Sequence, residues 1–520
     1  MLIFKNKLNG NWSNSLRFSP YYKTTTAMSI SCHLDRHSAL HIGLLAFIAI
    51  LLASCATNPV TGKKELMLLS KGQEQQMGME SDPQIVAAYG LYEDADLQRF
   101  INAKGQLMAR VSHRPDLKYE FKVLDSPVVN AFALPGGYVY FTRGIMAHFN
   151  NEAEFAGVLG HEIGHITARH SARQYSRQML GQIGLIAGIV VSPEFAQFAD
   201  VASQGLSLLF LKYGRDAESE SDRLGVEYST KIGYDAREMA DFFQTLGRLS
   251  DQAGGRLPTF LSTHPDPANR YQNTRQQAQQ WQQRYSNQRL EVGRDSYLRM
   301  IDGLIYGEDP RQGYVEGNAF YHPELLFFFP VPNAWKTVNS PSQVQMAPEG
   351  GEALLVLTLS GQPTLQRAEE AFLQQYNFQV TGRQNKQVNG LPARFISGQQ
   401  ADAQSGQVIQ LKAALIEYGG RVYQLLGMAY QAQYSKYEPQ FDRTMNGFAR
   451  LTDSGKINAA PERIKIVEAS RGGSLESLLR QQGVPASRLE EFAILNGMSL
   501  DDMVAAGTLF KVTQKGSPRP

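Results

Sequence analysis

Apolar residues recur at helical spacing in the stretch that begins at Asn151. The apolar positions are Phe155, Val158, Leu159, Ile163 and Ile166. Their separations of three, one, four and three residues place them along one face of a helix. Asn151 can cap the first turn, and Glu154 stands three residues later, in the position that a capping box requires. The pattern therefore predicts a long and largely buried helix from residue 151 onwards.

The same reasoning predicts further elements in the first half of the chain. Two stretches, at residues 179–191 and 195–211, are apolar but are interrupted by polar residues such as Gln182 and Asp200, so we expect core helices that at most touch lipid. Helices are expected over residues 73–89, 96–113 and 273–288, and strands over 119–124 and 138–142. Pro135-Gly136-Gly137 marks a turn ahead of the second strand.

The second half of the chain has a different pattern. A boundary rich in Gly, Asp and Pro falls at residues 307–317, and a second break falls at 455–461. Between the breaks, strand-like segments alternate with helical ones, which predicts a small α+β domain with a largely antiparallel sheet over residues 315–453. The strands are expected at 325–329, 353–359, 408–417 and 420–429, and the helices at 364–376 and 434–448. The last segment, 462–514, has the order strand, helix, helix, strand.

The expected fold class is therefore α+β: a mainly helical domain with a small β-sheet over residues 55–306, then the α+β domain, then the βααβ unit. The composition agrees with several globular domains, since the chain has 520 residues of which 42% are hydrophobic. A formal net charge of +2 argues against a dedicated nucleic-acid binder, which usually carries a basic patch.

An uninterrupted apolar run at residues 42–52 follows a positively charged leader and has the length of a signal peptide. It ends in Leu52-Ala53-Ser54-Cys55, which resembles the bacterial lipobox. We therefore expect residues 1–54 to be a lipoprotein signal peptide, with Met1 or Met28 as the start, and Cys55 to carry the lipid that attaches the chain to a membrane. Ala56 stands where inner-membrane lipoproteins commonly have aspartate, which favours the outer membrane. The alternative is a buried helix that ends at a cysteine.

The strongest chemical signal is His161-Glu162-Ile163-Gly164-His165. Residues four apart project from one face of a helix, so both imidazoles can bind one Zn²⁺ ion. Glu162 lies about 100° round the helix from His161, where it can take a proton from a metal-bound water as a general base. The alternative is an exposed helix with two solvated histidines, because a motif this short also arises by chance.

A catalytic zinc site needs a third protein ligand. The best candidate is Glu218, because Glu218 and Asp222 share one face of a helix. Glu218 can then bind the metal while Asp222 accepts a hydrogen bond from a ligand imidazole. Spacing alone favours Glu218 over Glu220 only slightly, and the alternative is an acidic, solvated helix face on which Glu220 has no special role.

Several ordered motifs over roughly residues 58–306 resemble the gluzincins of metallopeptidase family 48. They are Asn130-Ala131-Phe132-Ala133-Leu134-Pro135-Gly136-Gly137, Asn151-Glu152-Ala153-Glu154, the HEIGH pentapeptide, and Glu218 and Asp222 followed by Arg223-Leu224-Gly225. The resemblance implies that His161, His165 and Glu218 bind one zinc ion per chain, with Glu162 as general base and Asp222 as the hydrogen-bond partner of a ligand histidine. It is closest to the soluble envelope branch of BepA-type proteins, because the membrane spans of the prenyl-protease and HtpX-type branches are missing.

Three further features of this domain are candidates for function. The segment at residues 130–134 resembles the edge strand on which such enzymes hold an extended substrate, although an interior strand is the alternative. Arg215 is a candidate to hydrogen-bond the oxyanion of the reaction, and a surface salt bridge is its alternative. His264 stands in a loop bounded by proline, and we hypothesise that it reaches the zinc ion as a removable fourth ligand that keeps the enzyme latent. Loop packing is the alternative role.

The C-terminal segments add expectations about partners. Residues 462–514 resemble a divergent LysM module, a fold that often binds glycans such as peptidoglycan, and a small docking or stabilising domain is the alternative. The domain at 315–453 loosely resembles PsbP-type α+β domains, and its run of aromatic residues at 327–329 is expected to lie in the core.

The residues and the resemblance together predict a zinc-dependent endopeptidase of the periplasm, anchored by lipid at the outer membrane. Its expected substrates are unfolded or misassembled envelope proteins, peptidoglycan contact is a further expectation, and no nucleic acid is expected as a partner. Two alternatives remain open at this stage. One is an envelope chaperone or assembly factor with a latent peptidase site, and the other is a peptidoglycan-associated binding lipoprotein.

Overall fold

A computed structural model describes residues 55–176, 213–252, 260, 263–264, 270–401 and 407–516. The expected signal peptide and the apolar segments at residues 179–191 and 195–211 lie outside the described residues. The described part of the chain contains both helices and sheets, consistent with an α+β protein. None of its helices combines the length and the apolar character that crossing a membrane requires.

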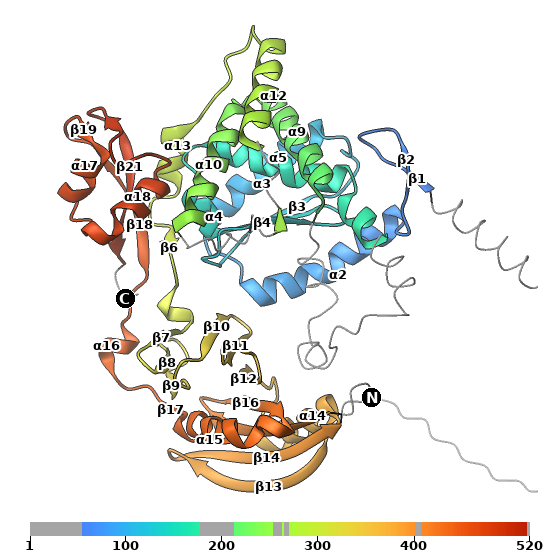
Figure 1. Ribbon diagram of the computed structural model, residues 1–520, viewed down its shortest axis with the longest axis vertical. Helices are drawn as coiled ribbons and strands as arrows, with labels where there is room; N and C mark the ends of the chain where they lie inside the picture. The colour runs from blue at the N-terminus through green and yellow to red at the C-terminus, as the bar shows by residue number, and fades with distance from the viewer. Residues whose placement is uncertain are drawn as a thin grey trace, which may run out of the picture. The chain divides into compact units, whose positions relative to one another are not determined.

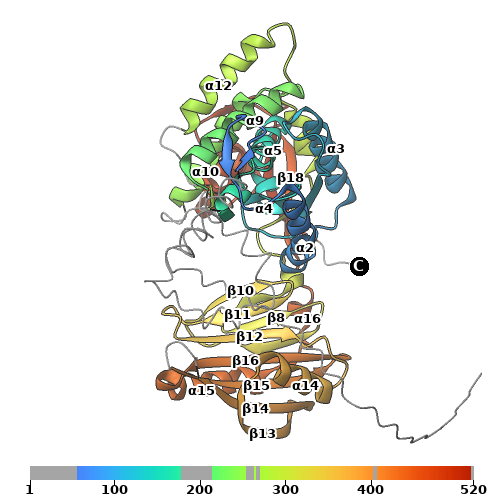
Figure 2. The same cartoon turned by 90° about the vertical axis from the view of Figure 1, so that its right-hand side faces the viewer.

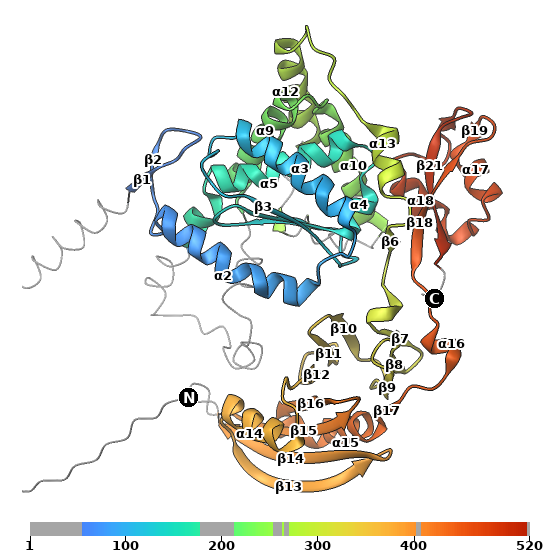
Figure 3. The ribbon, with the colours of Figure 1, turned by 180° about the vertical axis from the view of Figure 1, so that it is seen from behind.

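The first part of the described chain packs helices around a small three-stranded sheet (Figures 1 and 3). The strand order is β3-β5-β4, with β3 parallel to β5 and β4 antiparallel to it. The strands are β3 (Glu120–Leu124), β4 (Ala131–Leu134) and β5 (Tyr138–Thr142), and a separate hairpin joins β1 (Cys55–Thr57) to β2 (Lys64–Leu66). The helices are α2 (Lys71–Tyr89), α3 (Ala95–Val111), α4 (Arg143–His148), α5 (Glu152–Thr167), α9 (Arg215–Lys231), α10 (Arg237–Gln252), α12 (Arg270–Arg284) and α13 (Arg294–Met300). β4 is therefore an edge strand among the described residues, as expected for residues 130–134.

The start of α5 differs in one detail from the capping box that the sequence predicts. Asn151 caps the helix, since its side-chain oxygen accepts a hydrogen bond from the Glu154 backbone N–H at 2.8 Å. The Glu154 carboxylate, however, accepts from the backbone N–H of Asn150 at 2.7 Å rather than from that of the cap residue. Both N–H groups precede the helix proper and need an acceptor, so the carboxylate still satisfies a donor at this end of α5.

The middle part forms two antiparallel sheets (Figure 2). The larger has the order β10-β11-β12-β16-β15-β14-β13, and the smaller has the order β17-β9-β8-β7. The strands of the larger sheet are β10 (Lys336–Ser340), β11 (Gln343–Ala347), β12 (Ala353–Leu359), β13 (Gln379–Val388), β14 (Leu391–Ala401), β15 (Val408–Tyr418) and β16 (Arg421–Tyr430). Those of the smaller sheet are β7 (Tyr314–Glu316), β8 (Ala319–His322), β9 (Phe327–Pro330) and β17 (Ala449–Arg450).

Each face of the larger sheet has its own core. Alternate residues of β15 and β16 pack on one side with α15 (Gln431–Gly447) and on the other with α14 (Leu365–Tyr376). Phe327 and Phe329 are buried in the first of these cores, as the sequence predicts. The long hairpin of β13 and β14 was not predicted, because most β13 side chains are polar and exposed and show no alternation of apolar residues.

The C-terminal part has the predicted order of strand, helix, helix and strand. Its main elements are β18 (Glu462–Glu468), α17 (Leu475–Gln481), α18 (Leu489–Leu495) and β21 (Leu509–Lys515). β18 pairs with β21 on one side and with β6 (Ile305–Tyr306) on the other. Apolar residues of this unit also share one continuous hydrophobic core with the helices of the first part. The C-terminal unit is therefore packed against the first part of the chain and is not a separate module.

Lys511 of β21 joins this unit to the segment that leads into α5. Its side chain is buried, and Nζ donates hydrogen bonds to the carbonyls of Ala147 and Phe149, both at 2.9 Å. These carbonyls lie at the C-terminal end of α4, where a cation is favourable. Burial lowers the pKa of Lys511 and raises the pKa of Glu154, and the attraction between the two groups offsets part of both effects. The C-terminal unit thus stabilises the turn just ahead of α5.

Replacing Lys511 by alanine is expected to lower the free energy of unfolding by about 2–4 kcal/mol, because two buried carbonyls lose their donor and a cavity forms. Urea unfolding measures the loss, and limited proteolysis of the C-terminal unit locates it. Lys515→Ala is the matched control, since Lys515 is exposed on the same strand and its loss should change the stability by less than about 0.5 kcal/mol. Equal effects of the two substitutions would contradict this role of Lys511.

Candidate metal centre

Two glycines allow α5 and α9 to pack with their backbones in contact. A Cβ atom on Gly160 would lie 2.9 Å from the Cα atom of Gly225, and a Cβ atom on Gly225 would lie 2.9 Å from the carbonyl oxygen of Gly157. No larger side chain fits at either position without moving a backbone. This close approach sets α9 beside α5 (Figure 1). The side chains of Glu218 and Asp222 on α9 then lie beside the histidines of α5.

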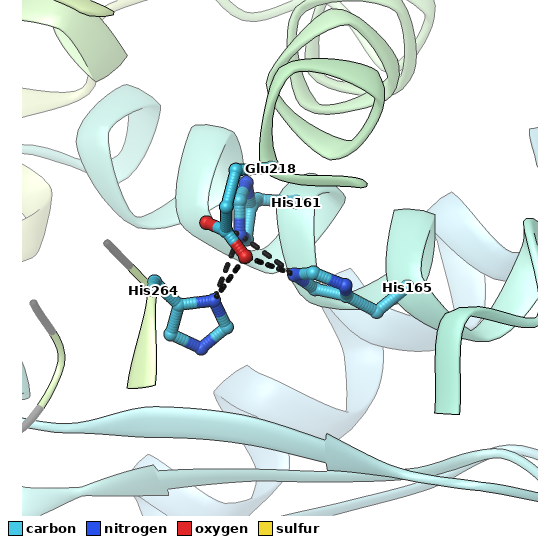
Figure 4. Close-up of side chains that lie close together, drawn as sticks. All are labelled: His161, His165, Glu218 and His264. Atoms are coloured by element: carbon cyan, nitrogen blue, oxygen red, sulfur yellow. Dashed lines mark hydrogen bonds and ion pairs between the residues drawn. The ribbon is translucent and has the colours of Figure 1, made fainter. Parts of the chain in front are cut away.

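Four buried side chains converge next to this helix pair (Figure 4). They are His161, His165, Glu218 and His264, and one ligand atom of each lies within 4.8 Å of the others. His161 Nε2 lies 3.0 Å from His165 Nε2 and 3.3 Å from His264 Nδ1. Glu218 Oε1 lies 3.1 Å from His264 Nδ1 and 3.5 Å from His165 Nε2. The structure therefore brings together three nitrogen atoms and a carboxylate.

The donors fit a metal ion in their protonation as well as in their spacing. His161 Nδ1 lies 2.9 Å from a carboxylate oxygen of Asp222, which can only accept, so His161 carries its proton on Nδ1 and its Nε2 presents a lone pair. A lone pair that faces other acceptors at about 3 Å needs a cation between them. In tetrahedral zinc sites with bonds of about 2.0–2.1 Å, neighbouring ligand atoms lie roughly 3.3 Å apart, which agrees with the distances here. The buried Glu218 Oε2 accepts no hydrogen bond from the described residues, so it too is available to a metal.

Asp222 is held by an arginine that the sequence did not indicate. Arg270, the first residue of α12, donates from Nε and Nη2 to the two oxygens of Asp222, at 2.8 and 2.7 Å. Its guanidinium group also lies over the ring of Phe243, 4.0 Å from the centroid. Burial opposes the charged form of Asp222, but Arg270 and His161 outweigh it and lower the pKa of this carboxyl. The local sequence gives no signal for Arg270, because Asp222 lies 48 residues away and its burial follows from the packing of α9 against α12.

His264 is the fourth potential metal ligand of the group. Its ring stacks on that of Phe260, with centroids 4.6 Å apart, and its Nε2 lies 3.7 Å from a carboxylate oxygen of Glu162. Burial opposes protonation of His264, yet the carboxylates of Glu218 and Glu162 raise its pKa. A positive charge among these groups is therefore favourable, whether it is a proton or a metal ion.

Glu162 is fully buried beside the four donors but is not one of them. Neither of its carboxylate oxygens accepts a hydrogen bond from the described residues. Burial raises the pKa of Glu162, which brings this carboxyl closer to the range in which a general base works near neutral pH. A buried carboxylate that accepts no hydrogen bond is costly, so Glu162 is a group kept for chemistry rather than for stability.

Glu220 has a partner after all, in contrast to our interpretation of it as a neighbour without a role. Its carboxylate lies 3.0 Å from Nε2 of His170, and Nδ1 of His170 lies 2.9 Å from Nδ1 of His165. Tyr213 stacks on the ring of His165, with centroids 4.0 Å apart. Burial lowers the pKa of both His165 and His170, which favours the neutral form of each ring.

Two further candidate residues lie in described elements. Arg215 is exposed at the first position of α9, three residues before Glu218. Cys55 is the first residue of β1, where it pairs with Leu66. β4 contacts α5 along the sheet edge, so an extended peptide added to β4 would run past the helix that carries His161 and His165.

Comparisons with known proteins agree with the chemistry of these residues. Residues 95–278 match the family described as Peptidase family M48. The chain is 32% identical over 239 residues to the beta-barrel assembly-enhancing protease of Escherichia coli, a match that covers 44% of this chain and 48% of the relative. It is 30% identical over 209 residues to the mitochondrial metalloendopeptidase OMA1 of Arabidopsis thaliana, covering 39% and 40% of the two chains. Residues 95–278 of this chain are thus similar to peptidase family M48.

The chain spans about half the length, or less, of the curated relatives that it matches. The matched family is one of peptidases, and the two relatives are named as a protease and as a metalloendopeptidase. Among solved structures, that of a cyanobacterial PsbP from Synechocystis aligns with 26% of this chain at 12% identity and a TM-score of 0.21.

Proposed function

We propose that this protein is a zinc-dependent endopeptidase of the bacterial cell envelope. One observation carries the proposal: three buried histidine nitrogens and a glutamate oxygen converge beside a buried glutamate that is not needed as a donor. A structural zinc site has no use for that extra carboxylate, whereas a hydrolytic site requires it as a base.

His161, His165 and Glu218 would hold the zinc ion, which when bound polarises a carbonyl group and lowers the pKa of a water molecule. Asp222 fixes the tautomer of His161, and Arg270 fixes Asp222. Glu162 accepts the proton of the attacking water and then delivers it to the leaving amine of the cleaved peptide bond. The edge strand β4 offers backbone hydrogen bonds to an extended substrate, which favours unfolded over folded proteins.

The proposal extends to substrates and location. Misfolded or stalled envelope proteins are the proposed substrates, in keeping with the printed name of the Escherichia coli relative. Lipid attachment at Cys55, a periplasmic position at the outer membrane and peptidoglycan contact through the LysM-like unit belong to the same proposal and rest on the sequence. His264 lies where it can be a fourth metal ligand, which would close the site to water. This position favours one alternative, an envelope chaperone or assembly factor in which the same peptidase site is latent.

Metal removal tests the proposal. The purified mature chain is expected to contain one zinc ion and to cleave unfolded casein, and a chelator should abolish the cleavage, because the ion supplies the electrophile. Adding back one equivalent of Zn²⁺ should restore it, as quantified by metal analysis and by release of peptides. Bound zinc with no cleavage, even in a variant freed of His264, would refute the endopeptidase assignment and favour the binding alternatives.

A further inference from the structure

The two histidines of α5 differ in what holds the ring nitrogen that faces away from the other donors. Nδ1 of His161 faces the carboxylate of Asp222 directly, at 2.9 Å. Nδ1 of His165 faces another imidazole, that of His170, also at 2.9 Å. His170 is 1% exposed, and its second nitrogen lies 3.0 Å from the carboxylate of Glu220. Nδ1 of His165 is thus held by a relay of two residues, His170 and then Glu220. Nδ1 of His161 is held by the single carboxylate of Asp222.

The contacts of this relay define one arrangement of protons for neutral rings. The carboxylate of Glu220 can only accept, so His170 carries its proton on Nε2 and its Nδ1 is an acceptor. His165 must then donate from Nδ1, which leaves the lone pair of its Nε2 free to face Glu218 and His161. The hydroxyl of Ser221 lies farther from Nδ1 of His170, at 3.3 Å. The opposite tautomer of His165 would place a proton toward the metal donors and break the contact with His170.

The relay also sets how the ring of His165 lies. Tyr213 stacks on one face of this ring at an interplanar angle of 21°, which fixes the plane of the ring. A flip of 180° about the bond between Cβ and Cγ returns the ring to the same plane, so stacking alone allows two orientations. The hydrogen bond to His170 selects one of them. Glu220 is itself held near Arg173, whose Nη2 lies 3.7 Å from the carboxylate.

We propose that His170, oriented by Glu220, is a positioning residue that keeps His165 in the tautomer and orientation needed to bind the metal. Its consequence for catalysis rests on the proposed function, whereas its consequence for metal binding does not. The stretch from Glu218 to Asp222 then has three acidic side chains with three distinct tasks. Glu218 binds the metal, Asp222 orients His161, and Glu220 orients His165 through His170.

The test compares His170→Leu with His170→Asn in the full mature chain. Leucine has a similar volume but no acceptor, so the affinity for Zn²⁺, measured by competition with a chelator, should fall by about 10- to 100-fold. Asparagine can place its side-chain oxygen near the position of Nδ1, so it should recover part of that loss. The absorption bands of the Co²⁺-substituted protein should shift in the leucine variant and return toward those of the wild type in the asparagine variant.

Glu220→Ala and Asp216→Ala form a matched pair on the same helix. Glu220 contacts His170, whereas Asp216 is exposed one turn earlier, so only Glu220→Ala should weaken Zn²⁺ binding, by less than His170→Leu does. This pair carries the test if His170→Leu fails to fold. Wild-type affinity and an unchanged Co²⁺ spectrum in His170→Leu, or equal losses in the two α9 variants, would overturn the proposal. Zinc binding without cleavage, both in the wild type and in His264→Ala, would refute the proposed function alone.

Discussion

Replacing Glu162 by glutamine is expected to lower the rate of peptide cleavage by about 10²- to 10⁴-fold, the range that a positioned general base contributes. Glutamine has nearly the same shape as glutamate but cannot accept the proton of the attacking water. The zinc content should stay at one ion per chain, because Glu162 is not among the four side chains that offer metal donors. Digestion of unfolded casein and metal analysis on the same preparation separate these two effects.

The same substitution also tests whether the buried carboxylate is kept for catalysis at the expense of stability. Glu162 has no hydrogen-bond partner among the described residues, so glutamine should leave the fold intact or stabilise it slightly. Glu80→Gln is the matched control, since it removes the same charge from an exposed position of α2. If Glu162→Gln retains more than about a tenth of the cleavage, as measured where His264 is also replaced, another group is the general base.

Much of the candidate site could be predicted because its residues lie at helical spacings along the chain. His161 and His165 are one turn apart on α5, and Glu218 and Asp222 are one turn apart on α9, so each pair shares a helix face whatever the rest of the fold does. What spacing could not supply is the contact between the two helices. The glycines at positions 160 and 225 allow that contact, and their effect depends on the neighbouring helix rather than on local sequence.

The residues that support the site escaped prediction for the same physical reason. Arg270 reaches Asp222 from α12, and His170 reaches Glu220 from beyond the end of α5, so neither pair is close in the sequence. Lys511 lies more than 350 residues from the carbonyls that it binds. Helical periodicity reports which residues share a face of one element, whereas these contacts depend on how different elements pack.

His264 bears on whether the site is open. A catalytic zinc ion keeps one position for water, whereas four protein ligands close the coordination shell, as in structural sites. His264 Nδ1 lies 3.1 Å from Glu218 Oε1 and 3.3 Å from His161 Nε2, close enough to be the fourth ligand. It belongs to neither α5 nor α9, the helices that carry the other three donors. The hypothesis is therefore that His264 holds the enzyme latent until it is displaced from the metal.

Replacing His264 by alanine is accordingly expected to raise the basal cleavage of unfolded casein. If the open form makes up about 0.1–10% of the wild-type population, the gain is about 10- to 1000-fold, because the variant is open in every molecule. The affinity for Zn²⁺ should fall at the same time, since a ligand is lost. Thr263→Ala is the matched control, because Thr263 hydrogen-bonds the carbonyl of Phe260 in the same segment but is not a metal donor. An equal gain in both variants would mean that loosening the segment, and not losing the ligand, opens the site, and no gain in His264→Ala would rule out latency through this residue.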